Sequence, residues 1–247
     1  MGEIVSVISG KGGVGKTLIT ANLGAALSRR GQNTLILDLN YRMDDLSYVL
    51  GLSDSTAYNL NDVIDGNCKI IEALLPVEGY DKLHFLPASS ARSLSSVSRT
   101  SFVKLLTMIR ENFNIILLDA PTGFSEGLSY ALEASDTAIL VTNPDPLSVG
   151  NTKKLLSDEL FSGVHKCFLL NRFDRKSLKE ERTLSPEACS TRIGEPLLGI
   201  IPESEEFLFA EGGTMIVSGK RSPVMTCFDH IAGRLLGEDI PINLKKI

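Results

Sequence analysis

A glycine-rich stretch near the start of the chain has the residue types that bind phosphate. Its eight residues are Gly10, Lys11, Gly12, Gly13, Val14, Gly15, Lys16 and Thr17. They fit the pattern G-x-x-x-x-G-K-[ST]. Glycines let backbone N–H groups close around phosphate oxygens, Lys16 supplies a positive charge, and the Thr17 hydroxyl can ligate Mg²⁺. The stretch is therefore predicted to bind a nucleotide.

The segments on either side favour this interpretation. Residues 4–8 are apolar and rich in β-branched side chains, as is typical of a buried parallel strand. Residues 18–30 have apolar side chains at helical spacing. A strand, a glycine loop and a helix N-terminus together form an anion site, because unpaired N–H groups and the helix dipole point at the phosphate. A glycine-rich turn without a ligand is the weaker alternative.

Two aspartates each end an apolar segment that is expected to be a strand, over residues 33–38 and 113–119. Asp38 and Asp119 would then lie at the carboxyl ends of parallel strands, where such sheets bind ligands. Asp119 ends a hydrophobic run in the Walker B arrangement, whose carboxylate meets Mg²⁺ or its water shell. Asp38 is a candidate Mg²⁺ partner, directly or through water, and a helix-capping aspartate is the alternative. We predict Mg²⁺ ligands at Thr17, Asp38 and Asp119.

A second lysine, Lys11, directly follows Gly10. The loop K-G-G-x-G-K-[ST] resembles that of the MinD/ParA family of deviant Walker A ATPases, and most of all its MinD branch. Asp-x-Pro-x-Gly at 119–123 resembles the family's switch II, and Leu-Pro-Ala-Ser at 86–89 is similar to a MinD segment. The resemblance extends to about Pro241. It implies ATP or ADP with Mg²⁺ between two subunits, with Lys11 reaching the partner's phosphates; a solvated lysine is the alternative.

Two positions depart from the family pattern. The family's D-x-D is Asp38-Leu39-Asn40 here, and the resemblance implies that Asn40 stands where an aspartate positions the attacking water. An amide can hydrogen-bond a water but cannot take its proton. Because phosphoryl transfer relies on positioning and electrostatics, we expect ATPase activity to be lowered rather than abolished. Leu18 replaces a phosphate-contacting Thr or Ser, which would weaken binding slightly. The catalytic candidates are Lys11, Lys16 and Asn40.

A base site is expected at the ends of two later strands. Residues 164–172 are an apolar segment that ends in Asn171 and Arg172, and residues 197–203 include Pro202. The resemblance implies that Asn171 hydrogen-bonds adenine and that Pro202 and its neighbours line the base. An ordinary turn asparagine is the alternative for Asn171.

The remaining patterns complete an α/β chain of 247 residues. Seven mostly apolar strands separated by helices predict one doubly wound, mostly parallel sheet with helices on both faces, as a single domain over 1–247. The further predicted strands are 83–88 and 136–142, and the further predicted helices are 46–50, 59–66, 102–112, 147–160, 186–192, 206–212 and 223–236. Residues 90–100 are expected to be a loop and residues 174–182 a charged segment without regular structure.

Composition narrows the partners. The net charge of −5 and the pI near 5.3 argue against broad electrostatic binding to DNA, since DNA binding depends on Lys and Arg. The four cysteines show no C-x-x-C spacing, which favours reduced thiols in the cytoplasm. Six residues follow Pro241, too few for the amphipathic membrane helix with which MinD proteins end. Membrane contact at the inner face is therefore expected only through a missing segment or a partner.

The sequence as a whole predicts an ATP-dependent homodimerisation switch that positions a cell-division or other polar machinery. Residues 38–45 and 119–123 would report the nucleotide state to an unidentified protein partner. A weakly hydrolysing scaffold for pilus or flagellum placement is an alternative, which Asn40 favours. A ParA-like DNA-partitioning ATPase is a second alternative, which the acidic pI disfavours.

Overall fold

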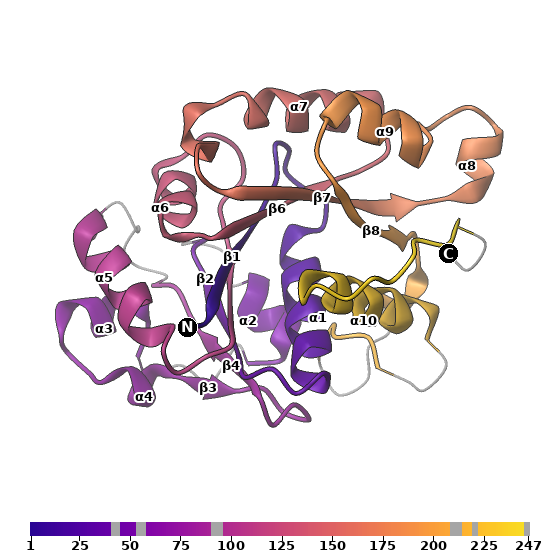
Figure 1. Cartoon of the computed structure of the whole chain (residues 1–247). Coiled ribbons are helices and arrows are strands. Elements are labelled where there is room, and N and C mark those ends of the chain that lie inside the picture. Colours follow the sequence, from indigo (N-terminus) through magenta and orange to yellow (C-terminus); the bar gives the residue numbers. More distant parts are fainter. Residues whose placement is uncertain (41–44, 53–57, 90–95, 208–213, 219–221, 245–247) are drawn as a thin grey trace.

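The computed structural model describes residues 1–40, 45–52, 58–89, 96–207, 214–218 and 222–244. One sheet has the strand order β3-β4-β2-β5-β1-β6-β7-β8 (Figure 1). The strands are β1 (Glu3–Ile8), β2 (Thr34–Asp38), β3 (Leu75–Pro76), β4 (Leu83–Leu86), β5 (Ile115–Asp119), β6 (Thr137–Thr142), β7 (His165–Phe173) and β8 (Leu197–Pro202). Every strand pair is parallel except β3 with β4. The predicted fold class and its seven strands are confirmed. The two-residue β3 was not predicted, because so short a strand has no periodicity to detect.

The helices connect these strands. They are α1 (Lys16–Arg29), α2 (Asp45–Leu50), α3 (Leu60–Asp65), α4 (Ile70–Ala73), α5 (Arg99–Ile109), α6 (Glu126–Ala134), α7 (Pro146–Leu156), α8 (Arg175–Lys179), α9 (Pro186–Ile193) and α10 (Pro223–Leu235). The short turns η2 (Glu159–Phe161) and η3 (Glu205–Phe207) are 3₁₀-helical.

Several helix predictions need correction. The charged segment 174–182 was expected to be irregular, but it contains α8, whose first N–H groups are capped by the Asp174 carboxylate. The helix predicted over 147–160 ends at Leu156, and a 3₁₀ turn follows. Helices α4 and α6 were not predicted. The helix expected over 206–212 lies largely outside the described residues, as does most of the loop 90–100.

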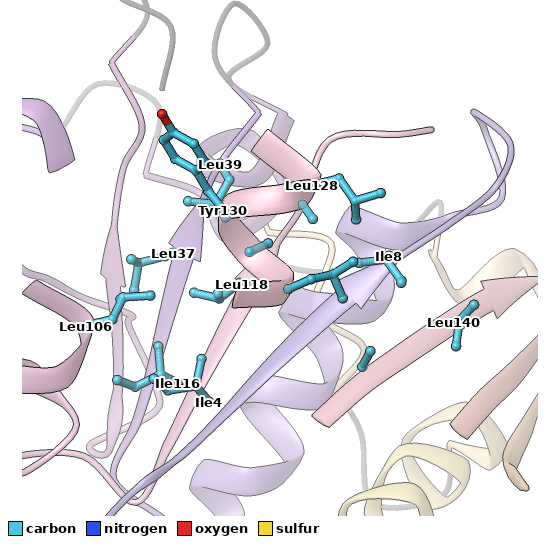
Figure 2. Close-up of a cluster of buried hydrophobic side chains, with 14 of the residues drawn as sticks. Ile4, Ile8, Leu37, Leu39, Leu106, Ile116, Leu118, Leu128, Tyr130 and Leu140 are labelled. Atoms are coloured by element: carbon cyan, nitrogen blue, oxygen red, sulfur yellow. The ribbon is translucent and has the colours of Figure 1, made fainter. Parts of the chain in front are cut away.

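Alternating side chains divide the core between the two faces of the sheet. Ile4 and Ile8 of β1 belong to one cluster, together with buried residues of α5, α6, α7 and α9. Figure 2 shows part of it, with Ile4 and Ile8 near Leu106 of α5 and Leu128 of α6. Val5 and Val7 point to the opposite cluster, which contains the buried faces of α1, α2 and α10. Both faces are therefore covered by helices, which explains why these strands are almost continuously apolar.

The same alternation determines the face on which the strand-end carboxylates lie. Leu117 of β5 packs in the α1-side cluster, so Asp119, two residues later, points to the α1 face. Asp38 is the register partner of Asp119 on β2 and points the same way. Asn171 shares its parity with Leu169, which also packs in the α1-side cluster. Strand periodicity thus brings three predicted site residues to one face.

The last described residues cross the end of the sheet. Helix α10 packs on the α1-side cluster, whereas Ile242 and Leu244 pack against the opposite one. Residues 240–244 therefore pass from one face to the other beside β8, the last strand in the order; Figure 1 shows this yellow segment next to β8. Covering an edge strand with a chain segment hinders its pairing with other molecules.

Arg234 holds this C-terminal segment in place. Its guanidinium donates to the Ile240 carbonyl at 2.7 Å and to the Pro241 carbonyl at 3.3 Å. A third hydrogen bond, 2.9 Å long, goes to the carbonyl of Leu198 in β8. One side chain therefore joins α10, the sheet edge and the C-terminal segment.

Candidate nucleotide-binding site

The loop 10–15 lies between β1 and α1, and its conformation requires glycine. Gly13 and Gly15 have φ values of +76° and +91°, in the left-handed region that favours glycine. Gly10 packs against α7 so closely that a Cβ there would lie 2.8 Å from the carbonyl of Asn151. No side chain caps the start of α1, and its first turn has no acidic residue. The free N–H groups of this 14-residue helix are therefore available to an anion.

Asp119 is the centre of a buried polar cluster at the start of α1. The Thr17 hydroxyl donates to Asp119 Oδ2 at 2.7 Å, and the Thr20 hydroxyl donates to Oδ1 at 3.3 Å. Lys16 Nζ lies 3.5 Å from Oδ1, and the Lys16 and Asp119 side chains are only 7% and 1% exposed. Two charges buried this deeply need each other as partners. The structure thus brings the predicted Lys16, Thr17 and Asp119 together.

Thr20 was not predicted as a member of this cluster. The single proton of its hydroxyl has a second acceptor, the Lys16 carbonyl one helical turn earlier, at 3.0 Å. A threonine four residues after Lys16 lies on the same side of the helix, and this spacing is the signal that could have identified it.

The end of β2 is joined to the end of β5. The Leu39 N–H donates to the Asp119 carbonyl at 3.0 Å, and the Asn40 N–H donates to Asp38 Oδ1 at 2.7 Å. Asp38 is 2% exposed and Asn40 is half-buried. The structure therefore places Asn40 directly beyond the two strand-end carboxylates. Residues 41–44 of the predicted switch segment 38–45 lie outside the described residues, and its last residue, Asp45, begins α2.

The donor set suits Mg²⁺. Thr17 offers a hydroxyl, and Asp38 and Asp119 offer carboxylates from register-paired positions. Mg²⁺ prefers such hard oxygen ligands and is usually bound by one or two carboxylates together with substrate phosphates. The described part of the chain holds no group of three or more His, Cys, Asp or Glu side chains that could cage a metal. The residues fit an ion that is held jointly with a nucleotide.

Lys11 is associated with α7. It is half-buried, and its positive charge acts on Asp145, the N-cap residue of α7. Burial raises the pKa of Asp145, but hydrogen bonds from Ser148 and the charge of Lys11 outweigh it, so the pKa lies below its usual value. Asp145 was not among the predicted site residues.

A cavity of about 430 Å³ adjoins the loop on the side of β7 and β8. It is lined by Gly15, Leu18, Asn171, Arg172, Pro202, Glu203, Ser204, Glu205, Phe207 and Met215. The residues predicted to contact the base, Asn171, Arg172 and Pro202, therefore border one cavity. Leu18, which departs from the family's loop pattern, borders it too. The acidic residues Glu203 and Glu205 of the lining were not predicted, nor was Met215 from the distant segment 214–218. Their positions depend on how the chain returns to α1.

Asn171 joins this cavity to the loop. Its side chain is 4% exposed, and Nδ2 donates to the Val14 carbonyl at 2.7 Å. A Cβ on Gly15 would lie 2.5 Å from the same nitrogen. The next residue, Arg172, has φ +55° at a shift of the β7–β8 register and lies 3.9 Å from Glu203. The loop glycine and the asparagine therefore depend on each other for space.

A second cavity, also about 430 Å³, lies between α10 and the C-terminal segment. Among its lining residues are Cys227, His230 and Arg234, and none belongs to the loop 10–17. The four cysteines are free thiols, and burial raises the pKa of Cys167 to about 12 and that of Cys189 to about 11. Among the described residues, no helix has both the length and the apolar character needed to cross a membrane.

Comparisons with known proteins agree with this geometry. The family described as AAA domain matches residues 2–161. The septum site-determining protein MinD of Synechocystis sp. is 32% identical over 244 residues, which cover 98% of this chain and 92% of that protein.

Solved structures extend the similarity to three dimensions. The MinC:MinD cell division protein complex of Aquifex aeolicus matches with a TM-score of 0.89 at 30% identity, over 98% of each chain. MinD of Pyrococcus horikoshii, complexed with Mg-ADP, matches with a TM-score of 0.83 at 29% identity, over 97% of this chain and all of that one. The chain therefore belongs to the MinD/ParA family of deviant Walker A ATPases, within its MinD branch.

Proposed function

We propose that this protein is an ATP-dependent dimerisation switch that binds ATP with Mg²⁺, hydrolyses it slowly and positions cell-division machinery. The observation that carries the proposal is the buried cluster of Lys16, Thr17 and Asp119 at the open N-terminus of α1. Similarity to septum site-determining MinD proteins supports the cellular role, and the Mg-ADP complex of one of them supports the ligand.

Each residue of the loop would have a distinct task. The backbone N–H groups of 12–17 would hold the phosphates, and Lys16 would balance their charge. Thr17, Asp38 and Asp119 would hold Mg²⁺, which when bound neutralises charge on the phosphate oxygens. Asn171 and Pro202 would orient the base. In this arrangement the chain supplies mainly position and electrostatic stabilisation.

The dimerisation step of this proposal rests on Lys11. The buried Asp119 cluster already contains Lys16, whereas the charge of Lys11 acts on Asp145, the N-cap residue of α7. We infer that Lys11 serves the phosphates of a second subunit across the loop face. Sizing the protein with ATP and with ADP tests this step. A protein that stays monomeric with ATP contradicts the role proposed for Lys11.

Asn40 determines the expected rate. Its amide can orient a water molecule but cannot accept a proton from it, so we expect slow turnover. The test is steady-state phosphate release from the wild type beside Asn40→Asp, with Lys16→Ala as the inactive control. We expect Asn40→Asp to raise the rate about tenfold or more, within the range of positioned acid–base groups. An unchanged rate contradicts the assignment of Asn40.

Asn40 also favours a second candidate, an ATP-binding scaffold that hardly hydrolyses. The two candidates differ in one measurement. A scaffold dimerises with ATP and shows no turnover above that of Lys16→Ala, whereas a switch returns to monomers as its ATP is consumed.

A further inference from the structure

Two exposed apolar side chains flank the phosphate-binding loop. The large hydrophobic residues exposed on the described surface are Met1, Tyr48, Tyr58, Ile71, Met108, Phe124, Leu147 and Leu160. Phe124 is 58% exposed and Leu147 is 63% exposed. Phe124 follows β5 and Leu147 follows β6, so both lie at the carboxyl edge of the sheet, as the loop does.

Both side chains belong to segments that are attached to the loop. The Gly123 N–H, next to Phe124, donates to the Ser9 carbonyl at 3.2 Å. On the other side, Gly10 packs against the backbone of Asn151 in α7. Leu147 lies four residues before Asn151 and hence on the same side of that helix. The two apolar groups therefore border the nucleotide loop, one from each neighbouring strand connection.

The loop and the start of α7 carry charges of both signs. Lys11 lies in the loop, and Asp145 caps the helix that carries Leu147. In a two-fold dimer the same patch faces itself, so a patch needs both charge signs to be complementary to its own copy. Apolar anchors surrounded by polar groups are also the usual form of an interface hot spot.

We propose that Phe124 and Leu147 are the apolar anchors through which two copies of this chain meet over their loops. The inference rests on the proposed dimerisation switch and names the side chains that would stabilise it. Single exposed hydrophobic residues are normal on protein surfaces, so position is what distinguishes these two. Met108, which is 69% exposed, lies at the end of α5 that leads into the amino end of β5, at the edge of the sheet away from the loop, and serves as the matched comparison.

The experiment measures the dimer dissociation constant by sedimentation equilibrium with a slowly hydrolysed ATP analogue. The variants are Phe124→Ser, Leu147→Ser, the double variant and the control Met108→Ser. We expect each single change to weaken the dimer about tenfold or more, because burial of a large apolar side chain is lost. Leu147→Met, which keeps the apolar volume, should dimerise as the wild type does.

ADP affinity and melting temperature of each variant verify that the monomer is intact, and both should be unchanged for residues this exposed. A double variant that dimerises as tightly as Met108→Ser contradicts the role of Phe124 and Leu147 but leaves the proposed dimerisation switch intact. A wild type that remains monomeric with ATP overturns the switch and the anchors together. Equal weakening by Met108→Ser would also overturn the inference, because the effect would not depend on position.

Discussion

Two cavities of about 430 Å³ each border β8, yet their chemistry differs. The cavity beside the loop meets left-handed Gly15, buried Asn171 and the charged pair Arg172 and Glu203. The cavity beside α10 is bordered mainly by apolar side chains and by Arg234, whose guanidinium is engaged by three carbonyls. Volume alone does not identify a binding site. Polar groups that converge beside an uncapped helix N-terminus do.

The two regions use their charged residues differently. Around Asp119, buried charge is concentrated where a phosphate and a cation would enter. The Arg234 guanidinium instead donates to three backbone carbonyls and so holds residues 240–244 beside β8. We therefore expect changes in the first region to affect activity most, and changes in the second to affect stability alone.

Asp119→Ala should have the largest effect. It would remove the partner of buried Lys16, which costs about 3–5 kcal/mol of unfolding free energy. It should also lower phosphate release by at least about 100-fold, because an electrostatic contact of the site is lost. Urea denaturation and a phosphate assay measure the two effects. Asp229→Ala, which removes a more exposed aspartate paired with Arg29, should cost under about 1 kcal/mol and leave activity intact.

Gly15→Ala should come next. The new Cβ would lie 2.5 Å from Asn171 Nδ2. Gly15 also has a φ of +91°, a backbone conformation that alanine rarely adopts. We expect loss of ATP binding by fluorescence titration and a stability loss of about 1–3 kcal/mol. Gly150→Ala is the matched control, because a Cβ there meets open space within α7. It should be neutral or stabilise by up to about 1 kcal/mol. Equal effects at the two positions would contradict the assigned close packing.

Arg234→Met should destabilise the protein without impairing the nucleotide site. Three hydrogen bonds to carbonyls would be lost, at about 1 kcal/mol each before relaxation. We expect a lower melting temperature and faster hydrogen exchange over 240–244, with ATP affinity unchanged. Arg234→Lys should restore little, because an ammonium lacks the planar fork of donors. A large loss of ATP affinity would show that the two regions are coupled.

His84, which lies outside both cavities, should have the smallest effect, a pH dependence of stability. Burial lowers the pKa of His84, which packs edge-on against Phe113, and within the described chain its Nδ1 has no hydrogen-bond partner. The unfolded chain, with the ordinary pKa of 6.5, then binds more protons than the folded one. Stability should therefore fall as the pH drops below about 6.5. Urea midpoints at pH 7.5 and 5.5 should differ less in His84→Phe than in the wild type, and His165→Gln is the exposed control.

Much of the site could be predicted because each part has a local signal. The loop pattern identifies Lys16 and Thr17, and an apolar run ending in a carboxylate identifies Asp119. Other parts had no such signal. Thr20 looks like any helical threonine, α8 depends on the Asp174 cap within a charged segment, and Met215 reaches the cavity beside the loop from a distant segment. Contacts between residues far apart in the chain leave no periodicity to detect.

The sequence by itself determined the fold class, the glycine-rich loop and the face of the sheet toward which each strand-end residue points. These features are readable from the sequence because glycine conformations and strand alternation are local properties. Tertiary structure decided which groups meet. It placed Lys16 against Asp119, Asn171 against Val14, and Arg234 against the C-terminal segment. These contacts depend on strand order and on the packing of α1, α7 and α10 against the sheet, which no single stretch of the chain encodes.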